Sequence, residues 1–183
     1  MRLYRVFPHD PSAVPSAPGG ALYVPPSSGL GRIDNPEEYD AFYLAGIEEA
    51  AVAESFGNLA VWRDESFVEA GRNVRYALAA YDLSKEARLF DFNDVEALQS
   101  LGVRRPTQVI TRDRRSTQEL ALRIYRRRRF AGVTWWSYYN PDWPICGLWN
   151  VAQLRLLGEP MALSATAPAV QRAAAAIVRQ IVL

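Results

Sequence analysis

Residues 31–54 read GRIDNPEEYDAFYLAGIEEAAVAE. The apolar run 41–45 is typical of a short buried strand, and Gly46 interrupts it. The following residues, Ile47–Phe56, predict a helix that Gly57 closes as a C-cap. At about 100° per residue, Glu54 shares a helix face with the small residues that precede it. An arginine, a tyrosine and a glutamate thus lie in succession on a predicted loop, strand and helix: Arg32, Tyr43 and Glu54.

The rest of the chain alternates strands and helices in a mixed order. Alternating patterns predict strands, and the Ser116–Glu119 capping-box pattern predicts the start of a helix that runs to about Arg129. Expected strands or extended pieces are 3–7, 58–64, 74–81, 87–90, 107–111, 130–136, 146–148 and 151–156, and further helices are 93–101, capped by Asp91 or Asn93, and 167–183. We therefore expect an α+β fold, with a mixed or antiparallel β core, flanking helices and a C-terminal helix.

Residues 8–30 contain six of the twelve prolines, with several glycines and serines. Long loops inside a compact domain are uncommon unless they serve a site. We expect this segment to be a lid or binding loop.

Composition excludes several classes of function. A length of 183 residues suits one domain. The chain has one cysteine, Cys146, which excludes a framework of internal disulfides. It also has one histidine, His9, so the sequence argues against a zinc site and against a Ser-His-Asp triad. Residues 1–20 lack the apolar run of a signal peptide, and the apolar stretch 173–178 is too short to span a membrane. We expect a cytoplasmic protein without a membrane segment.

Charge is distributed unequally along the chain. Residues 1–100 carry 8 Lys and Arg against 16 Asp and Glu, whereas residues 101–183 carry 13 against 4. The halves therefore have formal charges of about −8 and +9 (8 − 16 and 13 − 4). Such patches pair within one fold or mark faces for an anionic ligand and a partner.

Five motifs occur in an order that resembles the RES-domain family, which is named after its arginine, glutamate and serine. They span residues 3 to about 155: Tyr4-Arg5, Gly31-Arg32 with Asn35 nearby, Phe42-Tyr43-Leu44-Ala45, Ala53-Glu54, and Phe130-Ala131-Gly132-Val133 leading to Ser137. The chain departs from the family pattern at two points. Asn35 lies one position further along than usual, and Ser137 lies within a segment rich in Trp and Tyr.

The resemblance implies a toxin that degrades NAD+ and is neutralised by a cognate antitoxin, with a fold related to ADP-ribosyltransferases. It implies a catalytic domain at residues 1–160 and a helical extension of that domain at 161–183. Glu54 would support cleavage of the nicotinamide–ribose bond, Arg5 and Arg32 would bind phosphates, and Tyr43 and Ser137 would position the nicotinamide riboside. NAD+ would be a substrate and no cofactor is expected, because a Gly-x-Gly-x-x-Gly cradle is missing. If water attacks the ribose, the enzyme is a glycohydrolase. If inorganic phosphate attacks as a co-substrate, the enzyme is a phosphorylase.

Other interpretations remain open from the residues alone. Glu54 or Arg32 taken singly is more often a surface ion pair than a catalytic group. The chain could transfer ADP-ribose to a macromolecule, or bind nucleic acid without catalysis through Arg126–Arg129. We favour a simpler role for these arginines, as a solvated helix end that compensates the helix dipole. The C-terminal helix would dock on the domain or on a second copy of the chain.

Overall fold

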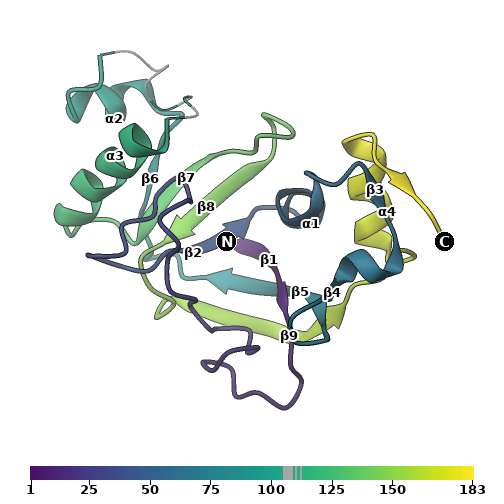
Figure 1. Cartoon of the computed structure of the whole chain (residues 1–183). Coiled ribbons are helices and arrows are strands. Elements are labelled where there is room, and N and C mark those ends of the chain that lie inside the picture. The colour runs from purple at the N-terminus through teal and green to yellow at the C-terminus, as the bar shows by residue number, and fades with distance from the viewer. Residues whose placement is uncertain (105–108, 110, 112) are drawn as a thin grey trace.

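Strand β1 lies inside a mostly antiparallel sheet, between β5 and β2 (Figure 1). The computed structural model describes residues 1–104, 109, 111 and 113–183. Within them, eight strands form one sheet in the order β4-β5-β1-β2-β8-β7-β6, with β9 also paired to β5, and only β6 and β7 pair in parallel. The strands are β1 Arg2–Pro8, β2 Phe42–Ala45, β4 Val68–Glu69, β5 Val74–Leu83, β6 Leu89–Asp91, β7 Gly132–Trp136, β8 Pro144–Leu148 and β9 Leu154–Ala162.

Two pairs of helices pack at separate places along the sheet. Figure 1 shows α2, Val95–Ser100, and α3, Arg114–Arg126, near β6, whereas α1, Glu48–Phe56, packs beside α4, Pro168–Ala176. A short 3-10 helix, Asp64–Phe67, follows β3, Val61–Trp62. The observed architecture confirms the predicted α+β class with a mostly antiparallel core.

The sheet separates two hydrophobic cores. Because side chains alternate along a strand, β1 sends Leu3 and Phe7 into one core and Tyr4 and Val6 against the other. The core that contains Phe42 and Tyr81, which we call the second core, faces the loop 8–30. The other lies under the helices, and the candidate site borders it.

Gly57 ends helix α1 as predicted, but for a reason of space. Its N–H donates to the carbonyl oxygen of Ala53 at 2.7 Å, and its backbone is right-handed, with φ −66°. An added Cβ would lie 2.4 Å from the ring of Tyr139. The glycine therefore permits a close approach between helix α1 and the segment after β7.

Two predicted helix starts were wrong. Asp113, not Ser116, caps α3: its carboxylate accepts hydrogen bonds from the N–H of Arg115 and the hydroxyl of Ser116. Asp94, rather than Asp91 or Asn93, caps α2 by accepting from the N–H of Ala97. Several Asx residues before a helix compete for the same capping geometry, and composition alone does not choose among them. Apart from two positions, Val109 and Thr111, the predicted extended piece 107–111 lies outside the described residues.

The C-terminal helix is shorter than predicted. Helix α4 ends at Ala176, Val178 adopts a positive φ of 55°, and Gln180–Ile181 forms β10, which pairs in parallel with β3. The helix docks on the domain itself: Val170 and Ala174 are buried in the core beside α1. The division at 160/161 falls inside β9. No helix of the described residues is long and apolar enough to cross a membrane.

Tyr81 makes the stability of the second core sensitive to alkaline pH. It is fully buried, and this burial raises the pKa of its phenol to about 12. The unfolded chain loses this proton near pH 10 whereas the folded chain keeps it, so stability is unaffected below pH 10 and falls as pH rises from 10 to 12. For Tyr81→Phe, we expect the free energy of unfolding to fall less steeply in this window, by up to about 1.4 kcal/mol per pH unit. Urea titrations between pH 8 and 11 test this, and parallel curves for the two proteins would contradict it.

Candidate functional site

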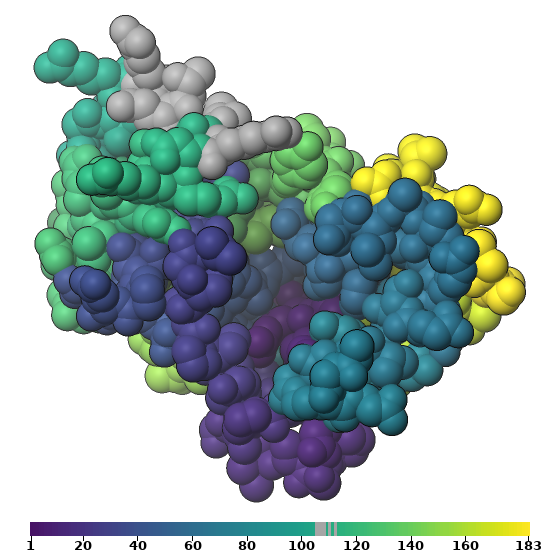
Figure 2. Space-filling model, in the orientation of Figure 1, coloured from purple at the N-terminus to yellow at the C-terminus, as the bar shows by residue number. Residues whose placement is uncertain are grey.

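A cavity of about 340 Å³ opens between the loop around residues 31–34, helix α1 and the β7–β8 hairpin. Figure 2 shows the molecule hollowed here, between the chain around residues 31–40 and α1. Its size is that of a small-molecule site. The lining residues that carry polar or aromatic groups are Tyr4, Arg5, Arg32, Tyr43, Glu54, Ser55, Arg114, Trp135 and Tyr138.

Glu54 and Ser137, the predicted catalytic carboxylate and the predicted serine, are hydrogen-bonded to each other. The Ser137 hydroxyl, buried just beyond β7, donates to Glu54 Oε1 at 2.6 Å, although 83 residues separate the two. The N–H of Tyr138 donates to the same oxygen at 3.3 Å, and the N–H of Tyr139 donates to Ser137 Oγ at 3.1 Å. The carboxylate is thus fixed through one oxygen, while Glu54 stays solvent-exposed at the cavity.

Arg32 lies on a loop that a buried carboxylate holds together. Asp34 accepts hydrogen bonds from the N–H of Gly31 at 2.9 Å and from the hydroxyl of Tyr43 at 2.6 Å. Arg32 Nη1 donates to the carbonyl oxygen of Val109 at 2.8 Å. Burial, together with the nearby charge of Arg114, lowers the pKa of Arg32 from its usual value. Even so, a guanidinium stays protonated throughout the physiological range.

Tyr43 joins the loop to the cavity wall. Its hydroxyl donates to Asp34 and accepts from the N–H of Ile33, and its ring meets Trp135 edge-on, with centroids 6.2 Å apart. Burial raises the pKa of Tyr43, so the phenol is neutral at physiological pH. Tyr43 therefore lines the cavity as predicted, but its hydroxyl is engaged in holding Asp34.

Asn35, the displaced asparagine, holds the loop rather than facing the cavity. Its side-chain nitrogen lies within hydrogen-bond distance of the carbonyl oxygens of Ile33 and Gln118 and of the hydroxyl of Tyr39. The Gln118 amide adds two more bonds to this loop, to the carbonyl oxygens of Gly29 and Gly31, both at 2.8 Å. Helix α3 thereby anchors the loop that carries Arg32.

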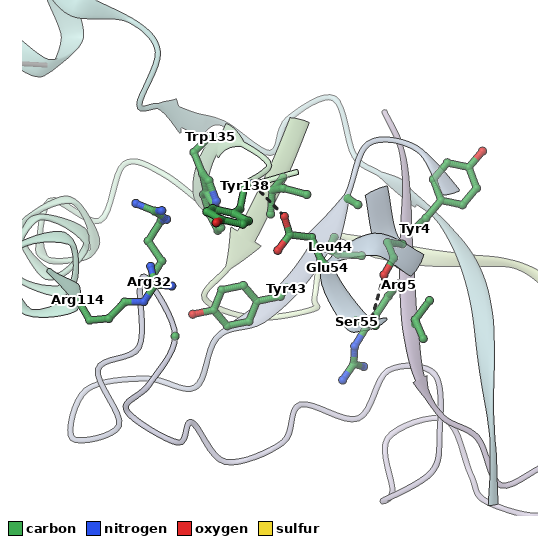
Figure 3. A pocket seen from close by; sticks show the side chains of 15 residues that line it. Tyr4, Arg5, Arg32, Tyr43, Leu44, Glu54, Ser55, Arg114, Trp135 and Tyr138 are labelled. Carbon is green, nitrogen blue, oxygen red and sulfur yellow. Dashed lines mark hydrogen bonds between the residues drawn. The ribbon is translucent and has the colours of Figure 1, made fainter. Parts of the chain in front are cut away.

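The predicted phosphate-binding role of Arg5 conflicts with the structure. Arg5 is among the residues that line the cavity, but its guanidinium lies on the opposite face of β1, 4.2 Å from the ring centroid of Phe42 and 3.0 Å from the carbonyl oxygen of Tyr23. Figure 3 shows it pointing away from Glu54. Alternation along the strand is the physical reason, because Tyr4 takes the side of β1 that faces the cavity.

Loop 8–30 and the arginine run also have structural roles. No residue of 8–30 lines the cavity, so the predicted lid is wrong; the loop covers the second core with Ala21, Leu22 and Val24. In the run, Arg126 pairs with Glu38, Arg127 donates to the carbonyl oxygen of Ser100, and the guanidinium of Arg128 lies over the ring of Tyr125. These local contacts agree with the favoured interpretation as a helix end.

Three of the site residues that were not predicted have distinct positions in the site. Arg114 begins α3 and lines the cavity beside Arg32, Trp135 contributes a wall, and Asp34 fixes the loop. Their sequence signals are weak, because Arg114 lies among other arginines and Trp135 among other aromatic residues. A second hollow of about 260 Å³ shares Arg32, Trp135 and Tyr138 with the first and so adjoins it.

Other chemistries find little support among the described residues. No group of three or more His, Cys, Asp or Glu side chains there is arranged to hold a metal ion. Cys146 is buried in the second core, which raises the pKa of its thiol to about 12. It is therefore not a nucleophile for this cavity.

The comparisons with known proteins agree on the fold. The RES domain family model matches residues 2–174. The crystal structure of the M. tuberculosis MbcT–MbcA toxin–antitoxin complex contains a chain with a TM-score of 0.58 and 16% identity, an alignment that covers 97% of this chain and 88% of that one. A search of curated proteins gives no match. The family match extends over nearly the whole chain and includes the Arg32 loop, Glu54 and Ser137, and the chain belongs to the RES-domain family.

Proposed function

We propose that the protein cleaves the bond between nicotinamide and ribose in NAD+. The observation that carries the proposal is the hydrogen-bonded pair of Glu54 and Ser137 at one side of a cavity that has arginines at the other. Figure 3 shows Arg32 and Arg114 opposite Glu54, with Tyr43 and Trp135 between them.

The chemistry of the bond suits this set of groups. Nicotinamide leaves the ribose as a neutral molecule, taking the bonding electron pair, so no general acid is needed. The ribose develops positive charge at its anomeric carbon, which a carboxylate such as that of Glu54 would stabilise. Water would then give ADP-ribose and a proton, and inorganic phosphate would give ADP-ribose 1″-phosphate.

The aromatic and cationic walls have separate roles in this proposal. The rings of Tyr43, Trp135 and Tyr138 offer contact surfaces for the planar nicotinamide. Arg32 offers a fixed positive charge for the diphosphate. The adjoining second hollow offers space for the other nucleoside.

Family membership and the similar complex support a biological role. We extend the proposal to a toxin that depletes NAD+ in the cytoplasm and is neutralised by a cognate antitoxin. The solved structure of similar fold is that of a toxin–antitoxin complex. Co-expression tests this part: the toxin alone is expected to stop growth and lower cellular NAD+, and co-expression of its cognate antitoxin is expected to restore both. Unchanged growth and NAD+ on expression of the folded chain alone would contradict it.

Incubation of the purified protein with NAD+, with and without inorganic phosphate, tests the activity. Chromatography and mass spectrometry are expected to show nicotinamide together with ADP-ribose or ADP-ribose 1″-phosphate, which separates a glycohydrolase from a phosphorylase. Label from NAD+ on protein or nucleic acid would instead indicate ADP-ribosyl transfer.

Ser137→Ala tests the support that the hydroxyl gives to the carboxylate. Loss of a charge-assisted hydrogen bond leaves Glu54 less well oriented, and we expect kcat to fall roughly tenfold, with a smaller change in KM. Ser100→Ala is the matched control, because the Ser100 hydroxyl donates to the carbonyl oxygen of Ala97 within α2 and Ser100 does not line the cavity. Equal kcat for Ser137→Ala and wild type would remove Ser137 from this role.

A further inference from the structure

We propose that Arg114 and Arg32 together form a diphosphate-binding subsite, in which Arg114 supplies the second guanidinium for the diphosphate of the substrate. This inference rests on the proposed function and names the residues that recognise the charged centre of the substrate. Arg114 takes the phosphate-binding role that was predicted for Arg5, whose guanidinium lies on the other face of the sheet.

The two guanidiniums come from different elements to one side of the cavity. Arg32 lies on the loop that Asp34 and Gln118 hold, and Arg114 is the first residue of helix α3. Both line the cavity, and Figure 3 shows them side by side. The positive charge of Arg114 is close enough to lower the pKa of Arg32.

Neither arginine has a carboxylate partner within 4.0 Å among the described residues. Other arginines there do have partners: Arg115 pairs with Glu119 at 3.0 Å, and Arg172 pairs with Glu48 at 2.7 Å. Two like charges side by side repel each other, and a bound anion would relieve that repulsion. The place is therefore suited to an anion with several oxygens.

A diphosphate fits this requirement better than a single carboxylate. Each of its two phosphates carries negative charge, and a guanidinium binds such oxygens through two parallel N–H donors. Glu54 lies across the cavity, where it would repel the diphosphate while favouring the cationic ribose. The opposed charges would therefore orient NAD+ with its nicotinamide riboside at Glu54.

Arg114→Gln tests the subsite, with Arg115→Gln as the matched control. Arg115 is the next residue of the same helix, its side chain is 88% exposed, and it does not line the cavity. Calorimetric titration with ADP-ribose is expected to show Kd raised roughly tenfold in Arg114→Gln and unchanged in Arg115→Gln. The salt dependence of Kd is expected to weaken in Arg114→Gln alone, because one screened charge is lost.

Kinetics with NAD+ provide the second readout. We expect KM to rise about tenfold in Arg114→Gln, with kcat within about twofold of wild type, because the interaction is made equally in the ground and transition states. An unchanged Kd for ADP-ribose in Arg114→Gln, equal weakening in both variants, or no binding of ADP-ribose by wild type would overturn the subsite. Binding of ADP-ribose without cleavage of NAD+ by wild type would instead contradict the proposed function and leave the subsite supported.

Discussion

Glu54→Gln is expected to lower kcat for NAD+ cleavage by about 10²- to 10³-fold, with little change in KM. Glutamine has nearly the shape of glutamate, and its carbonyl oxygen can still accept the hydrogen bonds from Ser137 and Tyr138 that Glu54 Oε1 accepts. What is lost is the negative charge near the anomeric carbon, where positive charge develops only as the bond breaks. The substitution is therefore expected to lower kcat and to leave substrate binding nearly unchanged.

Glu49→Gln is a suitable control for this variant. Glu49 lies on the same helix but pairs with Arg172 on the side that faces α4, away from the cavity. The substitution Glu49→Gln removes the same charge as Glu54→Gln and is expected to leave kcat unchanged. If Glu54→Gln kept full activity, or if both variants lost activity equally, Glu54 would not be the catalytic carboxylate.

Gly31→Ala is expected to lower kcat/KM on the order of 10²-fold and the free energy of unfolding by about 1–3 kcal/mol. A Cβ at this position would lie 2.1 Å from the Tyr43 hydroxyl oxygen and 2.5 Å from Asp34 Oδ1. These two atoms are hydrogen-bonded to each other, so they cannot move apart without loss of that bond. The loop that carries Arg32 must shift, and Arg32 shifts with it.

Gly71→Ala provides the control for Gly31→Ala. Nothing lies within 4 Å of a Cβ added at Gly71, so stability and activity are expected to match wild type. Denaturant unfolding and NAD+ cleavage measured on the same samples separate the two effects. Wild-type kinetics in Gly31→Ala would show that binding and cleavage of the substrate do not depend on the position of this loop.

The sequence predicted the site best where the residues lie on regular elements. The strand at 42–45 and the helix after it place Tyr43 and Glu54 as expected, because the apolar runs and glycines there have one simple interpretation. The contact between Glu54 and Ser137 depends on the β7–β8 hairpin bringing the segment after β7 to α1. Nothing local in the sequence encodes that distance, and Ser137 entered the predicted site only through the family resemblance.

The errors also have local physical causes. Arg5 was placed by its motif, but strand alternation gives Tyr4 and Arg5 opposite faces, and the sequence does not say which face holds the site. Loop 8–30 was expected to be a lid because of its length, yet its apolar residues cover a core. Arg114 was missed because one arginine among many has no distinguishing pattern until α3 places it beside Arg32.

Release of nicotinamide from NAD+ by the purified, folded and antitoxin-free protein is the most direct measurement. Wild type is expected to release nicotinamide in equal amount to the NAD+ consumed, and Glu54→Gln is expected to release at least about 10²-fold less per unit time. NAD+ that stays intact with wild type, both with and without inorganic phosphate, would contradict the proposed activity.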